Sequence, residues 1–188
     1  MILIADSGST KCDWALIDRN GTRLGGFETM GLNPYFHNED VVESAIRGNA
    51  PLSLYADKVK EIYFYGAGSS TDVMCQIIET GLKRVFPNAH IVVDHDLVGC
   101  AYATYDGEEC IACILGTGSN SCSFDGKEIH EEVPSLAFIL GDEASGSYFG
   151  KILLREYFYR KLPADLKEAF EKTFSISKDE FISRVYRE

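Results

Sequence analysis

The stretch ILIADSGSTKC, residues 2–12, decides the fold, because it joins an apolar strand to a turn of glycine and hydroxyl residues. Residues 2–5 have the continuous apolar character of a buried strand. The turn at residues 6–11 is expected to expose successive backbone N–H groups, and Gly8 lets a phosphate approach the backbone closely. Asp6 cannot bind phosphate directly, so we expect it to hold a water on Mg²⁺. An ordinary polar hairpin turn is the alternative.

A second stretch repeats this design. CIACILGTGSNSC, residues 110–122, again runs from an apolar strand into a glycine turn and on into another strand. DSGSTKC (6–12) and GTGSNSC (116–122) share Gly, Ser and Cys at three of seven places. Chance could produce this match, but it suggests two related hairpins that face one ligand. Neither turn matches the Gly-x4-Gly-Lys-Ser/Thr loop or the dinucleotide Gly-x-Gly-x-x-Gly loop.

Between and after these turns, strands alternate with helices, which predicts a layered α/β fold with a mixed sheet. The hairpin signal Arg19-Asn20-Gly21 makes the opening an antiparallel meander. We place a domain boundary near residues 104–109, giving a first domain over 1–104 and a second over 105–188. The expected strands after the first are 13–18, 23–29, 62–65, 91–93, 110–115 and one reaching 124; the expected helices are 40–47, 72–86, 96–105, 145–161 and two within 164–188.

Composition and net charge limit the kinds of binding partner that are expected. The chain has 188 residues, of which 45% are apolar and 25% charged, as in an ordinary globular protein. A net charge of −11 disfavours nucleic acid and anionic membrane surfaces. Phosphates would therefore be held by backbone N–H groups and a metal rather than by lysine clusters. The first residues lack the basic region of a signal peptide and no apolar run could span a membrane, so a cytoplasmic protein is expected.

The six cysteines are expected to be reduced and buried, since a chain of this size needs no disulfide staples. Cys110 and Cys113 have metal-like spacing, but they lie in an expected strand. Residues three apart in a strand point to opposite faces. A zinc site is therefore not expected here.

Three motifs resemble the BadF and N-acetylglucosamine kinase family of the actin/hexokinase superfamily, in the family's order. They are the turn at 6–11 followed by Asp13-Trp14, the turn at 115–120, and GDEASG at 141–146. The resemblance implies a ribonuclease H-like mixed sheet with flanking helices, one full domain plus part of a second. It also implies that ATP is clamped between the two turns. Because family members continue well beyond this length, we expect the chain to be C-terminally truncated.

The same resemblance implies that Asp96, in the stretch His95-Asp-Leu-Val-Gly99, is the catalytic base. Phosphoryl transfer to a hydroxyl needs a carboxylate that accepts its proton. Asp94 would share a strand face with Asp96, so the residues alone cannot choose between them; the family's Asp-x-x-Gly arrangement favours Asp96. A helix N-cap is the other interpretation of Asp96.

The remaining site residues fall into two groups. Asn33 could donate to and accept from sugar hydroxyls, or be a turn Asn before Pro34. Asp142 and Glu143 could accept from sugar hydroxyls, or be acids at a helix N-terminus. The expected sugar-binding residues are Asn33, Asn120, Asp142 and Glu143; the expected ATP-binding residues are Asp6, Gly8, Ser9, Thr10, Lys11, Gly116, Thr117, Gly118 and Ser119.

The function implied is an ATP- and Mg²⁺-dependent kinase for a hydroxyl of a small sugar, with an amino sugar such as N-acetylglucosamine first. Residues 134–140 (PSLAFIL) stand where N-acetylglucosamine kinases carry Gly-Gly-Trp-Gly, so the sugar itself stays open. Two alternatives belong to other classes. One is an ATPase activator of a 2-hydroxyacyl-CoA dehydratase, with a cysteine-bound iron–sulfur cluster; the other is a non-catalytic sugar sensor. A homodimer is compatible with all three.

Overall fold

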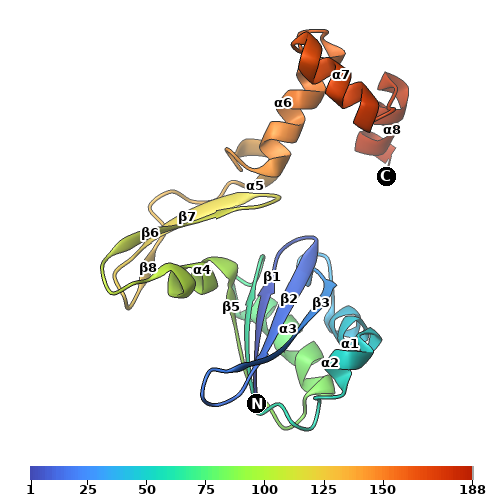
Figure 1. Cartoon of the computed structure of the whole chain (residues 1–188). Coiled ribbons are helices and arrows are strands. Elements are labelled where there is room, and N and C mark those ends of the chain that lie inside the picture. The colour runs from blue at the N-terminus through green and yellow to red at the C-terminus, as the bar shows by residue number, and fades with distance from the viewer. Residues whose placement is uncertain (188) are drawn as a thin grey trace.

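The computed structural model describes residues 1–187; residue 188, the last of the expected tail and of the second domain, lies outside the described residues. The chain forms a lower body around a five-stranded sheet and an upper part around a three-stranded sheet, followed by helices that lead away (Figure 1). A mixed sheet with flanking helices was predicted, and the structure confirms it. Among residues 1–187, no helix has the length and apolar character needed to cross a bilayer.

The first sheet has the strand order β3-β2-β1-β4-β5. β1 (Ile2–Ser7), β2 (Lys11–Ile17) and β3 (Arg23–Met30) form the antiparallel meander that the sequence predicts. β4 (Glu61–Gly66) pairs parallel to β1, and β5 (His90–His95) pairs parallel to β4. The expected strands were shorter by one or two residues at several ends, because residues such as Ser7 and Asp94 still pair with the neighbouring strand.

One face of this sheet carries the main core. Alternate residues such as Leu3 of β1, Trp14 of β2 and Phe64 of β4 are buried together with residues of α1 and α3. α1 (Glu39–Gly48) is capped by Asn38 and α3 (Asp72–Val85) by Thr71. A short helix, α2 (Ala50–Ser53), follows α1 and was not predicted.

α4 (Asp96–Thr104) starts at the end of β5 and joins the two halves, because it contacts β1, β4 and β5 on one side and β6 and β7 on the other. β6 (Cys110–Leu115) and β7 (Ser119–Phe124) form the second predicted hairpin. A two-residue strand, β8 (Ile129–His130), extends it and was not predicted. The core here comprises five buried residues: Leu97, Ala101, Ala112, Cys122 and Phe124.

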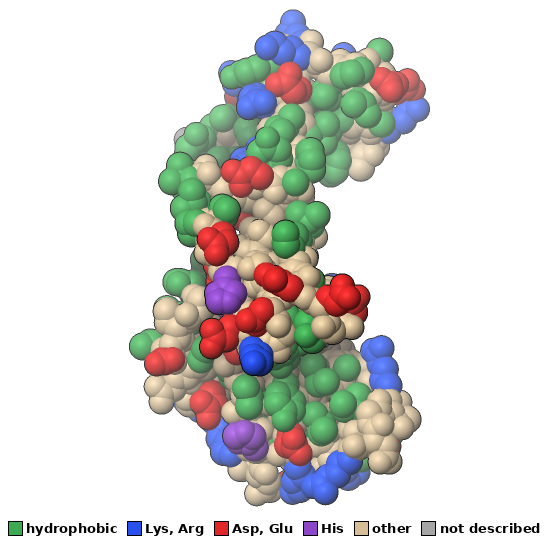
Figure 2. All heavy atoms as spheres, turned by 90° about the vertical axis from the view of Figure 1, so that its left-hand side faces the viewer, with side chains coloured by type: hydrophobic (Ala, Val, Ile, Leu, Met, Phe, Trp, Pro, Cys, Tyr) green, Lys and Arg blue, Asp and Glu red, His purple; other side chains and the backbone are tan. Residues whose placement is uncertain are grey.

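The rest of the chain is helical and poorly covered. α5 (Ala137–Leu140) was not predicted, whereas α6 (Gly146–Phe158), α7 (Ala164–Thr173) and α8 (Lys178–Arg187) match the expected helices. Aromatic contacts such as Tyr157 with Phe170 hold α6 to α7. Apolar side chains nevertheless gather on the surface of this upper part (Figure 2).

The cysteines only partly follow the expectation of buried thiols. All six are free, but Cys12 and Cys122 alone are buried, and Cys113 is exposed. Cys110 and Cys113 lie on opposite faces of β6, as the strand spacing predicts: Cys110 packs beside the core of the second half, and Cys113 faces outward. The expectation was wrong where one face of β6 is uncovered.

Candidate functional site

The site residues of the first half converge on one edge of the five-stranded sheet. β1, β3, β4 and β5 all run in the same direction, so their carboxyl ends lie together. The turn at 8–10, the loop at 31–37, the turn at 67–71 and the start of α4 follow these four ends. Open α/β sheets bind their ligands outside the carboxyl ends of the strands. The upper part of the molecule sits over this edge (Figure 1).

The first turn exposes two neighbouring backbone donors. Its shape is closed by the N–H of Gly8, which donates to the carbonyl of Lys11 at 3.0 Å. The N–H groups of Ser9 and Thr10 donate to no acceptor within residues 1–187. A Cβ on Gly8 would meet only the Lys11 carbonyl, at 3.7 Å, so the space before the turn is open. The turn can therefore offer two N–H groups to an anion.

Lys11 is the one cation of this turn, and an acid already engages it. Its Nζ lies 2.7 Å from Asp13 Oδ2, and both side chains are mostly exposed. The hydrogen bond to Asp13 raises the pKa of Lys11 above its ordinary value. An exposed pair of this kind is weak, so Lys11 remains able to turn toward a phosphate.

The loop that carries Asn33 braces the first turn. Leu32 N–H donates to Ser7 Oγ at 2.9 Å, and Gly31 N–H donates to the Thr10 carbonyl at 3.0 Å. A Cβ on Gly31 would lie 2.3 Å from the Gly8 carbonyl oxygen. Only glycine fits there without moving the turn. The Gly-Leu-Asn-Pro sequence indicated a turn, but not what the glycine touches.

Asn33 is partly a turn residue. Its Oδ1 accepts a hydrogen bond from Tyr35 N–H at 2.9 Å, which is the local turn role considered as the alternative. Its Nδ2 has no acceptor in the described chain. A Cβ on Gly68 would lie 2.5 Å from Asn33 Oδ1, so this loop is in contact with the turn after β4. Asn33 thus retains a donor at the carboxyl edge.

The second turn is also closed by a backbone hydrogen bond, which spans two residues where that of the first turn spans three. Gly116 N–H donates to the Gly118 carbonyl at 2.9 Å, and the N–H groups of Thr117 and Gly118 have no acceptor within residues 1–187. Ser119 differs from its neighbours, because its N–H donates to Asp142 Oδ1 at 3.2 Å and its Oγ to the Glu143 carbonyl at 2.8 Å. Both of its donors are in use, so Ser119 holds the turn in shape.

The element at residues 141–146 locks this second turn from behind. Gly146 N–H donates to the Gly116 carbonyl at 2.9 Å, and Ser147 N–H to the Thr117 carbonyl at 3.2 Å. Ser145 is the N-cap of α6, which has no acid in its first turn. Interpreting Asp142 and Glu143 as helix N-terminal acids is therefore wrong. Asp142 instead adopts φ 60° and points its carboxylate at Ser119.

Asn120 turns away from the glycine turn. Its Oδ1 accepts from Ser121 N–H at 2.8 Å, and its Nδ2 lies 3.5 Å from Glu131 Oε2, next to β8. These contacts do not bring it to Asp142 or Glu143. Glu143 is exposed, and only its backbone carbonyl holds the turn.

Asp94 and Asp96 have different surroundings, although two residues separate them. β5 ends at His95, so Asp96 is the first residue of α4. Asp94 and Asp96 therefore do not share the strand face that the sequence suggested. His95, not Asp96, occupies the N-cap position, so the N-cap interpretation of Asp96 is wrong. Asp94 Oδ1 accepts from the backbone N–H of His95 at 2.8 Å.

The Asp96 carboxylate lies in a mostly buried setting that shifts its proton affinity. Its side chain is 18% exposed, and Oδ1 lies 3.3 Å from His95 Nε2. Burial raises the pKa of Asp96 above its ordinary value; His95 and the N–H of Leu97 oppose this rise, and the negative charge of Asp6 adds to it. α4, which begins at Asp96, contacts β1, which contains Asp6. Burial raises the pKa of both Tyr65 and Cys75, and the charge of Asp94 adds to each rise.

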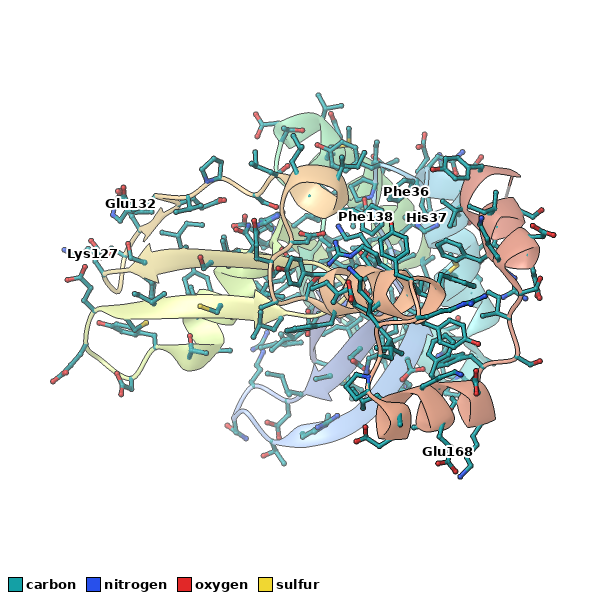
Figure 3. The ribbon with its side chains drawn as sticks, turned by 90° about the horizontal axis from the view of Figure 1, so that it is seen from above. Phe36, His37, Lys127, Glu132, Phe138 and Glu168 are labelled. Carbon is teal, nitrogen blue, oxygen red and sulfur yellow. The ribbon has the colours of Figure 1, made fainter. Side chains whose placement is uncertain are left out.

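The two glycine turns face each other across the space between the halves. Figure 1 shows the tip of β6–β7 above the tip of β1–β2, on the same side of α4, and Figure 3 shows them close together from above. Within residues 1–187, no three His, Cys, Asp or Glu side chains are arranged to hold a metal by themselves. A cation here would need the oxygen atoms of a bound phosphate as further ligands.

Neither a protein-family model nor a curated protein matches the chain. Solved structures do match. A protein of Porphyromonas gingivalis described as a "putative N-acetylglucosamine kinase" shares 40% of residues and superposes with a TM-score of 0.90; the match covers all of this chain and 66% of that one. A similarly described protein of Chromobacterium violaceum is 16% identical, with a TM-score of 0.66 and coverage of 100% and 68%. A "putative N-acetylmannosamine kinase" of Listeria monocytogenes is 15% identical, with a TM-score of 0.54 and coverage of 98% and 69%.

The chain therefore belongs to the actin/hexokinase superfamily, the class that its sheets and paired glycine turns define. Within it, the neighbours are proteins described as N-acetylglucosamine kinases and ROK family proteins. The more distant matches show the fold alone, and an ethanolamine utilization protein is among them at 16% identity. A shared fold of this kind does not transfer an activity, so the activity has to be argued from the site.

Proposed function

We propose that the whole protein is an ATP-dependent kinase that phosphorylates a hydroxyl of a small sugar, with amino sugars such as N-acetylglucosamine as the first candidates. One observation carries the proposal: a mostly buried carboxylate, Asp96, stands at the carboxyl edge of the sheet close to Asp6 of a turn with unpaired N–H groups. A base beside an anion-binding turn is the arrangement that phosphoryl transfer to a hydroxyl requires.

Four backbone donors support nucleotide binding. Ser9, Thr10, Thr117 and Gly118 each have an N–H without a protein acceptor in the described chain, two on each side of the space between the halves. An acidic protein of net charge −11 needs such neutral donors to hold phosphates. Asp6 fits an outer contact to Mg²⁺ through water, and the metal would neutralise phosphate charge. ATP and Mg²⁺ thus remain part of the proposal.

Asp96 would act as the base at the sugar side. Its carboxylate accepts the proton of the sugar hydroxyl as the oxygen attacks phosphorus. Burial raises its pKa, which makes the carboxylate a stronger proton acceptor than an exposed Asp. Asn33 Nδ2, with its free donor, and Glu143, exposed beside the second turn, would bind sugar hydroxyls.

The test is an ATP-dependent phosphorylation screen of the full-length protein over amino sugars and hexoses, with Asp96→Asn run in parallel. Phosphorylation of an amino sugar that Asp96→Asn abolishes would support the proposal. Nucleotide hydrolysis without any sugar product, together with iron in anaerobically purified protein, would favour the dehydratase activator. Sugar binding without turnover would favour the sensor.

A further inference from the structure

The residue before the proposed base has an unusual orientation. His95 stands at the N-cap position of α4, yet its side chain makes no capping hydrogen bond to the helix. Its Nε2 lies instead 3.3 Å from Asp96 Oδ1, and the imidazole is 21% exposed. The mostly buried ring of His95 therefore contacts the Asp96 carboxylate rather than capping the helix, and from there it can influence that carboxylate.

Opposing influences act on the Asp96 carboxylate. Burial and the charge of Asp6 work against its ionised form, whereas His95 and the backbone N–H groups of Leu97 and Asp96 favour it. A general base must be ionised and must present a fixed oxygen to the substrate hydroxyl. A donor on Oδ1 restricts rotation of the carboxylate and leaves Oδ2 for the substrate. His95 answers both requirements from a position that contacts one oxygen only.

We propose that His95 is a positioning residue for Asp96: its imidazole ring contacts Oδ1, which orients the carboxylate so that Oδ2 faces the sugar hydroxyl. This proposal rests on the proposed function, since it assigns a role in the same site. It adds a residue that the motif comparison did not include. His95 takes no proton from the substrate and contacts the reaction only through Asp96.

The first experiment measures kcat and the sugar KM of the full-length protein for His95→Ala, His95→Gln and His90→Ala. Losing this polar contact to a charged group should lower kcat about tenfold to a hundredfold in His95→Ala, with the sugar KM changing much less. His95→Gln keeps a nitrogen donor of similar reach and should recover most of this loss. His90 is exposed at the opposite end of β5 and serves as the matched control, with unchanged kinetics.

Two kinetic results would overturn the proposal. One is a wild-type kcat in His95→Ala; the other is a folded His95→Gln that is as slow as His95→Ala. Asp96→Asn separates the two hypotheses. If it keeps full activity, the base and the proposed mechanism are wrong. If it is inactive while His95→Ala is not, only the role of His95 is wrong.

A second measurement needs no substrate and applies whatever the sugar is. The histidine side chains of the full-length protein are labelled with ¹⁵N, and their resonances are compared in wild type and Asp96→Asn. The His95 signals should move while those of His90 do not, because His95 loses a charged acceptor. Unchanged His95 signals would show that the contact does not form, and would overturn the proposal even if no kinase activity were found.

Discussion

Each half of this molecule carries a glycine turn, but the two turns differ in the segment that braces them and in the size of the core beneath them. In the first half, the turn at 8–10 is braced by a loop that follows β3, over a sheet whose core contains eighteen buried apolar residues. In the second, the turn at 116–118 is held by residues 142–147, and the core beneath it comprises five. Both turns are thus held by hydrogen bonds from a second segment, although the cores beneath them differ in size.

The two sheets differ in what pairs with the first strand of each glycine-turn hairpin. β1 pairs on one side with β2 and on the other with β4, whereas its counterpart β6 pairs with β7 alone among the described residues. The outward residues Ile111 and Leu115 of β6 are 75% and 69% exposed. This half also holds most of the exposed apolar surface in Figure 2. The second half is thus the less stable support for its turn.

The largest expected effect concerns the base that lies between the halves. Asp96→Asn in the full-length protein should lower kcat by about 10²- to 10⁴-fold, because the amide keeps the shape and loses the basicity. The sugar KM should change far less, since the amide still forms hydrogen bonds. Asp94→Asn is the control, with a smaller loss expected. If Asp94→Asn were the inactive variant, the base would be assigned to the wrong carboxylate.

The next effect tests whether the second turn binds phosphate. Gly118→Val should weaken ATP binding to the full-length protein about tenfold to a hundredfold, because the side chain obstructs the N–H groups that would bind a charged phosphate. Its Cβ would also lie 3.0 Å from the Asp142 carboxylate. Titration calorimetry measures the affinity, and Gly48→Ala, where a Cβ meets nothing within 4 Å, is the control. Unchanged affinity in Gly118→Val would contradict the clamp.

The two braces can be compared by replacing a glycine at each contact with alanine. Gly31→Ala should destabilise the first half by about 1–3 kcal/mol, because the new Cβ meets the Gly8 backbone at 2.3 Å. Gly118→Ala should cost less, since the Asp142 side chain can move. Gly8→Ala, with open space around it, is the reference. The fluorescence of Trp14, buried in the first core, reports unfolding of that half. Equal costs for Gly31→Ala and Gly8→Ala would refute the brace.

A smaller effect is expected on thermal stability. Burial raises the pKa of Asp96 in the folded state, so the folded protein binds this proton more tightly than the unfolded chain. Its contribution to stability is therefore lost as pH rises through the folded pKa. Asp96→Asn should melt at a higher temperature than wild type at pH 7, and the gap should narrow toward pH 4. A lower melting temperature at pH 7 would mean that the ionised carboxylate is well compensated.

The smallest effect concerns the exposed face of β6. Ile111→Ser with Leu115→Ser should reduce self-association of the 188-residue chain, because it removes apolar side chains beside an unpaired strand edge. The stability should change by no more than about 0.5 kcal/mol, as for other surface substitutions. Sedimentation velocity over a range of concentrations measures the association.

We also expect this chain to bind nucleotide weakly, and robust kinase activity from it would contradict that.

Much of the fold could be predicted from local pattern. The apolar runs, the hairpin at 19–21 and the cap at Thr71 each depend on neighbours in sequence, and their elements formed where expected. Short elements such as α5 and β8 were missed, because two to four residues carry too little periodicity to be recognised. The contact of Asp142 was missed for another reason. Asp142 was expected to bind a sugar hydroxyl or to lie at a helix N-terminus, whereas Ser145 caps that helix and Asp142 accepts from the N–H of Ser119, 23 residues earlier.

The sequence by itself determined the paired strand–turn–strand units, the mixed α/β class and the motif residues, because these depend on side-chain period and on glycine at particular turns. Only the tertiary structure decided which donors stay free and which carboxylate stands beside Asp6. Ser119 looks like its neighbours in the sequence and lost both donors to residues 142 and 143. Asp94 and Asp96 look equivalent until β5 ends at His95 and the chain turns into α4. Such choices depend on contacts between distant segments, which local pattern does not contain.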